Sequence, residues 1–124
     1  MIPILIKIGV LLSLLQIALA ATPSNSYELV PPEPNQDVYS LVQRYFPTSS
    51  VDTALRIIKA ESSFNPLAKN SSSSASGLFQ ITRDTKKDFC PQADLFLVED
   101  NIKCAVSIYL KTGWSRWSAS GNWK

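Results

Sequence analysis

The chain has 124 residues, a length typical of one domain. Its 12 lysines and arginines against 10 aspartates and glutamates give a formal net charge of +2, too small an excess to predict nucleic acid or a strongly acidic partner. The chain contains no histidine and only two cysteines, which are too few good ligands for a zinc site. We expect neither a metal nor a cofactor.

The first 20 residues have the pattern of an export signal. One cation, Lys7, precedes an apolar run from Ile8 to Ala20 that closes on the small-x-small sequence Ala18-Leu19-Ala20. An uncleaved membrane anchor is the alternative, but Gln16 and the small-residue ending favour cleavage. We therefore expect a secreted or periplasmic protein of the cell envelope, with no stable membrane span after the signal is removed.

Residues 21–34 contain four prolines and no apolar period, which predicts a flexible tether. The folded domain then occupies residues 35–124. Its first predicted helix has Asn35 as N-cap and ends before Pro47. The helix has apolar side chains at i, i+3, i+4 and i+7, namely Val38, Leu41, Val42 and Tyr45.

Ser50 or Asp52 is the predicted N-cap of a second helix. This helix should end at Asn65-Pro66, because the residue before a proline avoids the helical region. A third helix is expected from Leu97 to Thr112, with Gly113 as its C-cap. The serine run at residues 71–74 reads as a surface loop, and no strand pattern is visible, so the sequence predicts a mainly helical domain.

Cys90 and Cys104 suggest a disulfide rather than a metal site if the protein is exported into an oxidising compartment. A bridge that closes a loop of about 15 residues would stabilise the fold by about 3 kcal/mol. Two buried free thiols are the alternative.

Four short segments carry the functional information. They are Glu-Ser-Ser-Phe-Asn-Pro at residues 61–66, Gly-Leu-Phe-Gln-Ile at 77–81, Asn-Ile-x-x-Ala-x-x-x-Tyr-Leu at 101–110 and Trp-Ser-Arg-Trp-Ser at 114–118. In this order they resemble the catalytic module of soluble lytic transglycosylases, enzymes of the lysozyme-like superfamily that cut peptidoglycan. The resemblance covers roughly residues 51–117. It implies a single small, mainly α domain of lysozyme-like fold with an active-site cleft.

Glu61 is the candidate catalytic residue. A carboxyl group held against the apolar side of a helix keeps its proton more readily, and such an acid can protonate a glycosidic oxygen. From its position alone, a solvated glutamate near a helix end is the more ordinary interpretation. The resemblance implies instead that Glu61 is the general acid and base.

The resemblance also implies a substrate-binding group made of Ser62, Gln80 and Tyr109. The Ser62 hydroxyl could bond the carboxylate or the helix backbone, and without a histidine it has no base to activate it as a nucleophile. The Gln80 amide suits an N-acetylated sugar, with a bond to the loop backbone as the alternative. Tyr109, by analogy, would bring its hydroxyl to Glu61.

A glycine, an asparagine and two tryptophans of these segments also have expected roles. Gly77 would allow the backbone to approach a ligand closely. Asn101 is expected to cap or orient its helix rather than touch sugar. One of Trp114 and Trp117 should be a core residue and the other could stack on sugar.

Together these features predict an exported lytic transglycosylase that cuts the MurNAc-β-1,4-GlcNAc bond of peptidoglycan glycan strands. Because no motif supplies a second carboxylate, we expect non-hydrolytic cleavage with 1,6-anhydro ends. The alternatives are a hydrolytic lysozyme helped by Asp84 or Asp88, and a non-catalytic peptidoglycan-binding module. A part in a secretion or phage-type apparatus is a further possibility. The family's later Ala-Tyr-Asn segment is missing, and Trp-Ser-Arg-Trp-Ser-Ala-Ser stands in its place.

Overall fold

Four α-helices and two short 3-10 helices make up the part of the chain that the computed structural model describes, residues 34–121 and 123–124. The elements are α2 (Pro34–Tyr45), η1 (Thr48–Ser50), α3 (Val51–Ser62), α4 (Arg83–Phe89), α5 (Val98–Thr112) and η2 (Ser115–Trp117). In this part only isolated β-bridges occur, Lys69 with Ser76 and Ser76 with Ile81. The predicted mainly helical fold is confirmed.

The predicted export signal at residues 1–20 lies outside the described residues, as does the tether at 21–34 except for Pro34. The described residues belong to one compact unit, Pro32–Lys124. No helix within them is long and apolar enough to cross a membrane.

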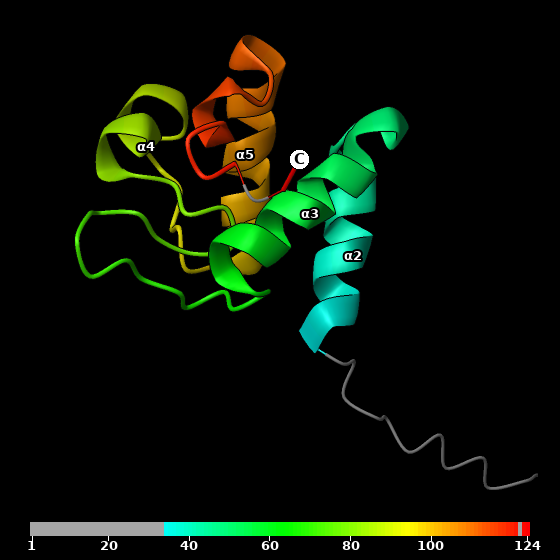
Figure 1. Cartoon of the computed structure of the whole chain (residues 1–124), viewed down its shortest axis with the longest axis horizontal. Helices are drawn as coiled ribbons and strands as arrows, with labels where there is room; N and C mark the ends of the chain where they lie inside the picture. The colour runs from blue at the N-terminus through cyan, green and yellow to red at the C-terminus, as the bar shows by residue number, and fades with distance from the viewer. Residues whose placement is uncertain (1–33, 122) are drawn as a thin grey trace, which may run out of the picture. The chain divides into compact units, whose positions relative to one another are not determined.

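The helices form one apolar core. In α2, Val38 and Val42 of the predicted apolar face are buried, whereas Leu41 and Tyr45 are partly buried. In Figure 1, α2 lies on one side of α5 and α4 on the other, and both helices contact α5. The side chains that α2, α3 and α5 bury are Val38, Val42, Ala54, Ile57, Ile58, Ile102, Ala105 and Ile108. Removal of these side chains from water is the main force that holds the helices together.

Two helix ends agree with the sequence, while one start and one end differ. Helix α2 begins at Pro34, so Asn35 is not its N-cap. Helix α2 ends at Tyr45, before Pro47, and α5 ends at Thr112 with Gly113 as C-cap. Helix α3 stops at Ser62 rather than at Asn65-Pro66, so that prediction was wrong. Ser63 and Phe64 adopt positive φ angles of 51° and 62°, so the chain turns out of the helix before the proline is reached.

Helix α4 was not predicted, because its sequence Arg-Asp-Thr-Lys-Lys-Asp-Phe has no apolar period. Its N-cap is Thr82, whose side chain accepts a hydrogen bond from the Thr85 amide. At its other end, Cys90 forms a disulfide with Cys104 of α5, with a Cα–Cα distance of 5.5 Å. Local capping and a covalent link to α5 hold this polar helix in place, and the free-thiol alternative is wrong.

Candidate active site

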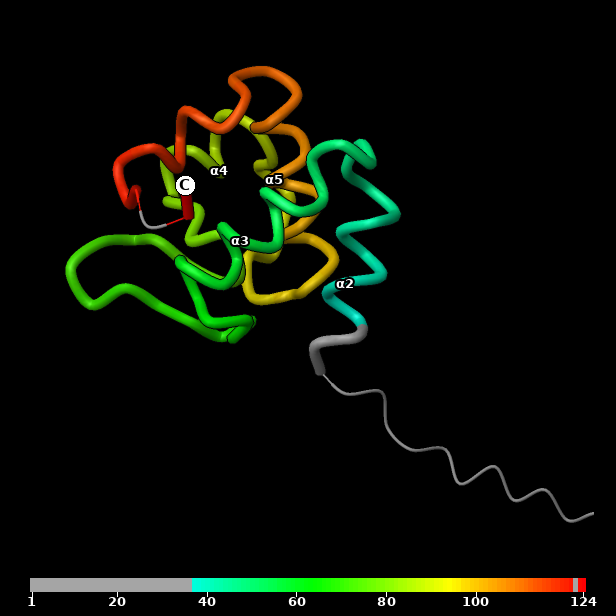
Figure 2. The backbone as a smooth tube through the Cα atoms, turned by 45° about the vertical axis from the view of Figure 1, so that its right-hand side comes forward, coloured from blue at the N-terminus to red at the C-terminus, as the bar shows by residue number. Residues whose placement is uncertain are grey.

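Glu61 lies in the last turn of α3 with its side chain half-buried. Its Oε1 atom is 2.5 Å from the hydroxyl oxygen of Ser120, a residue 59 positions later in the chain. Figures 1 and 2 show how the contact arises: after α5 the chain turns back, and the C-terminal segment comes to lie beside α3.

The Ser120 hydroxyl has a second neighbour. Its oxygen lies 2.9 Å from the carbonyl oxygen of Trp117, which can only accept a hydrogen bond. A serine hydroxyl carries one proton, so Ser120 cannot donate to Trp117 and to Glu61 at the same time. In the structure Ser120 donates to Glu61 Oε1. A protonated Glu61 would be able to donate to Ser120, which would leave the serine proton for Trp117. When Glu61 is ionised, Ser120 donates to the carboxylate.

Trp117 connects this pair to the Gly77–Ile81 turn. Its indole is 5% exposed and its Nε1 donates to the carbonyl of Phe79 over 2.9 Å. The two rings also pack with centroids 5.6 Å apart. Trp117 is therefore the core tryptophan that the sequence predicted without identifying it, while Trp114 is half-buried. Glu61 and the turn that contains Gln80 are linked through Ser120 and Trp117.

Asn101 holds the turn from the other side. This fully buried residue of α5 accepts a hydrogen bond from the Phe79 amide at 3.0 Å, and its Nδ2 donates to the carbonyls of Ser76 and Leu95 at 3.1 and 2.8 Å. All polar side-chain atoms of Asn101 bind backbone, which agrees with the expectation that it does not touch sugar. Asn101 does not cap α5, because the N-cap of that helix is Leu97. Asn101 orients the turn from its place in α5.

Gly77 is required by Asn101 rather than by a ligand. Its φ is +76°, and a Cβ there would lie 2.1 Å from the Leu95 carbonyl oxygen and 2.3 Å from Asn101 Nδ2. The expectation that Gly77 admits a ligand close to the backbone is corrected, because protein atoms already fill that space.

Gln80 uses its amide nitrogen inside the protein. Its Nε2 donates to the carbonyls of Ala68 and Gly77, each at 3.0 Å, and the side chain is half-buried. Because both N–H groups are engaged, Gln80 can offer a ligand its amide oxygen. A cavity of about 170 Å³ beside it is also lined by Thr85, Arg116 and Trp117.

The hydroxyls of Ser62 and Tyr109 bind groups other than the Glu61 carboxylate. Ser62 is buried and donates to the Ile58 carbonyl one turn earlier, at 3.0 Å. Tyr109 shares a 2.5 Å hydrogen bond with the hydroxyl of Ser50, which precedes α3. The substrate-binding roles given to these two residues remain predictions.

Ser120 is the site residue that sequence reasoning missed. It lies in a stretch of serines and tryptophans without a period, and no motif marks it. The one available signal was its position, because this stretch stands where the resemblance leads one to expect Ala-Tyr-Asn. Asp84 and Asp88, the candidates for a helper carboxylate, are exposed on α4, which packs against α5.

Residues 43–121 match the family model of the transglycosylase SLT domain. The match covers more than half of the chain and includes Glu61, the Gly77–Ile81 turn, Asn101 and Ser120. No curated protein and no solved structure shows a significant match to the chain. The family match, together with the helical core behind Glu61, identifies the chain as a member of the transglycosylase SLT domain family, which has a lysozyme-like fold and acts on peptidoglycan.

Proposed function

We propose that the protein is an exported peptidoglycan lytic transglycosylase that cuts the MurNAc-β-1,4-GlcNAc bond with Glu61 as its one catalytic carboxylate. The observation that carries the proposal is the position of Glu61. The residue lies in the last turn of a core helix, bonds Ser120 and is linked through Trp117 to the turn that holds Gln80.

The hydrogen bonds of Ser120 support a glutamate that changes its protonation state during the reaction. In the structure Ser120 donates to Glu61 Oε1, and its hydroxyl also lies within hydrogen-bond distance of the Trp117 carbonyl. A protonated Glu61 could donate to Ser120, which would then donate to Trp117. After Glu61 has given up its proton, Ser120 donates to the carboxylate. One hydroxyl thus has a partner for both states, as a group that acts first as acid and then as base requires.

In the proposed reaction Glu61 gives its proton to the glycosidic oxygen, and the bond from that oxygen to C1 of the muramic residue breaks. The acetamido group of the substrate stabilises the oxocarbenium-like centre in place of a second protein carboxylate. The C6 hydroxyl then attacks C1 while Glu61 takes its proton. The products are a 1,6-anhydro end and a free GlcNAc hydroxyl, and no water is consumed.

We assign the substrate contact to the Gln80 amide oxygen, which can accept from the acetamido N–H group. Ser62 and Tyr109 support the site through the helix that carries Glu61. Ser62 ties the last turn of α3 to Ile58, and Tyr109 joins α5 to Ser50 at the start of α3. Export is supported by the signal pattern and by the disulfide, which is typical of oxidising compartments.

Digestion of purified peptidoglycan followed by mass spectrometry tests the proposal. We expect muramic ends one water lighter than reducing ends. Reducing muramic ends would identify a hydrolytic lysozyme. Binding to the wall without any soluble product would identify a peptidoglycan-binding module.

A further inference from the structure

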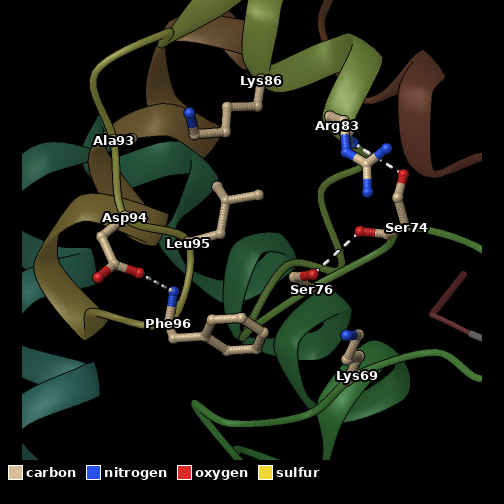
Figure 3. A pocket seen from close by; sticks show the side chains of 9 residues that line it. All are labelled: Lys69, Ser74, Ser76, Arg83, Lys86, Ala93, Asp94, Leu95 and Phe96. Atoms are coloured by element: carbon tan, nitrogen blue, oxygen red, sulfur yellow. Dashed lines mark hydrogen bonds between the residues drawn. The ribbon is translucent and has the colours of Figure 1, made fainter.

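A second hollow adjoins the loop that precedes Gly77. Figure 3 shows this cavity, which has a volume of about 620 Å³. The side chains of Ser74 and Ser76 line it from one side, and Leu95 and Phe96 line it from the other. Glu61 does not line it, so it is distinct from the proposed catalytic carboxylate.

The cavity carries an excess of positive charge. Lys69, Arg83 and Lys86 surround it, against one carboxylate, Asp94. None of the three cations forms an ion pair within the described part of the chain. Asp94 accepts from the Phe96 amide at 3.0 Å, and Lys86 donates to the Pro91 carbonyl at 2.8 Å. The guanidinium and ammonium groups can therefore bind an anion without first breaking a salt bridge.

The cationic groups also adjoin a neighbouring hollow. Lys69, Ser74 and Arg83 line a space of about 730 Å³ along the serine-rich loop as well as the first cavity. An extended ligand could therefore pass from one hollow to the other across these three side chains.

The backbone around the cavity is held in place before any ligand arrives. Asn101 binds the carbonyls of Ser76 and Leu95, and the Arg83 amide donates to the Ser74 hydroxyl at 2.9 Å. Because these bonds already fix the wall, little conformational entropy is lost when a ligand binds there. Leu95 and Phe96 add apolar surface, and Phe96 is 37% exposed.

We propose that this cavity binds the carboxylate-bearing peptide stem of peptidoglycan. This inference rests on the proposed function, which supplies the substrate class. The sugars of the glycan strand are neutral, whereas each stem carries free carboxylates and small apolar side chains. The carboxylates can form charge-assisted hydrogen bonds with the lysine and arginine side chains of the cavity, and the methyl groups can pack against Leu95 and Phe96.

Gln80 and the cavity are close enough along the loop for one substrate to contact both. Ser76 lines the cavity and Gln80 follows four residues later, so their Cα atoms lie within about 14 Å. A stem of four or five residues spans a similar length. A muramic residue beside Gln80 can therefore extend its stem into the cavity.

Binding of a defined stem fragment to the full chain with Glu61→Gln, which prevents cleavage, tests this inference. The probe is N-acetylmuramoyl-L-alanyl-D-glutamate with both carboxylates free, compared with its diamide. We expect the free acid to shift the NMR amide signals of Ser74, Ser76, Leu95 and Phe96. Conversion to the diamide should weaken binding about tenfold, the loss expected for a charge-assisted hydrogen bond.

Two variants, each lacking one positive charge, distinguish binding in the cavity from a general electrostatic attraction to the protein. Arg83→Gln should also weaken binding about tenfold. Lys87→Gln removes a charge from α4 at an exposed position that does not line the cavity, and it should leave the affinity unchanged. Equal losses in both variants, or equal affinity for acid and diamide, would overturn the inference. Tighter binding of poly(glycerol phosphate) at the same residues would also overturn it, because the cavity would then belong to a phosphate polymer.

Cleavage kinetics distinguish a failure of stem binding in the cavity from a failure of the proposed catalytic function. With the wild-type glutamate restored, Arg83→Gln should raise KM on walls that carry stems and leave cleavage of stem-free glycan strands unchanged. Normal cleavage of both substrates by this variant, with no stem binding, would remove the inference and leave the proposed function. Stem binding in the cavity of a protein that cleaves neither substrate would remove the proposed function and keep the binding site.

Discussion

Ser120 and Glu61 form a 2.5 Å hydrogen bond between residues 59 positions apart in the chain. The bond brings the C-terminal segment to the end of α3 and gives the glutamate a partner that can either donate or accept. The proposed chemistry therefore depends on one residue that a motif marks and one that only the fold brings to it.

Replacing Glu61 by glutamine should abolish wall lysis and leave the fold intact. The amide cannot transfer the proton, and general acid–base catalysis contributes typically 10²–10⁴-fold. Its oxygen can still accept from Ser120. The measurement is zymography on purified peptidoglycan, with circular dichroism as the control for folding. A folded variant that keeps most of its lytic activity would remove Glu61 from its proposed role.

Ser120→Ala should lower kcat about tenfold and leave KM unchanged, because the lost hydrogen bond acts on Glu61 and not on the sugar. Ser120→Thr keeps a hydroxyl and should restore most of the rate. Steady-state kinetics on soluble glycan strands measures both quantities. If alanine and threonine reduce kcat equally, Ser120 contributes to packing only.

Reduction of the Cys90–Cys104 bridge should lower the free energy of unfolding by about 3 kcal/mol. For a domain of this size the loss corresponds to a melting temperature lower by on the order of 10–20 °C. Intact mass should rise by two hydrogens on reduction. Free alkylation of both cysteines in the native, unreduced protein would contradict the bridge.

Gly77→Ala should destabilise the domain strongly, and Gly113→Ala is its matched control. Both glycines have positive φ, +76° and +62°, so both substitutions carry backbone strain of about 1–2 kcal/mol. Open space surrounds Gly113, whereas a Cβ at Gly77 would collide with Leu95 and Asn101. Urea unfolding should therefore show an additional loss of about 1–3 kcal/mol for Gly77→Ala. Similar losses in the two variants would contradict the packing around Gly77.

The contact between Tyr45 and Glu99 should make the stability of the fold depend on pH in the alkaline range. The Tyr45 hydroxyl donates to Glu99, and this hydrogen bond, followed by desolvation and the negative charge, raises the pKa of Tyr45 despite the opposing effect of Arg44. A raised pKa in the folded state means that the stabilising contribution is complete below about pH 10 and is lost as pH rises through the folded-state value.

Phenolate absorbance during a pH titration measures this effect. Glu99→Gln should move the Tyr45 transition to lower pH, because the charge and the strongest acceptor are both removed. Superimposable titration curves of the wild type and this variant would show that Glu99 has no effect on Tyr45.

Periodic apolar residues were sufficient to predict α2 and α5, because each helix buries one continuous face and ends at a residue with a known preference, Pro47 or Gly113. The same pattern did not reveal α4, whose stability comes from a cap and a disulfide rather than from a buried face. The end of α3 was misplaced because Ser63 and Phe64 adopt left-handed φ angles. Serine and phenylalanine have no preference for this conformation, so the sequence does not predict the turn.

The order of short motifs in the sequence determined the family and pointed to Glu61 as the catalytic candidate. The tertiary structure decided which atoms those residues bind. The partners of Gln80, Ser62 and Tyr109 turned out to be backbone carbonyls and Ser50, and the partner of Glu61 turned out to be Ser120. A motif records residue types and their spacing, whereas a hydrogen bond depends on which distant segment the folded chain returns to within 3 Å, and only the packed helices determine that.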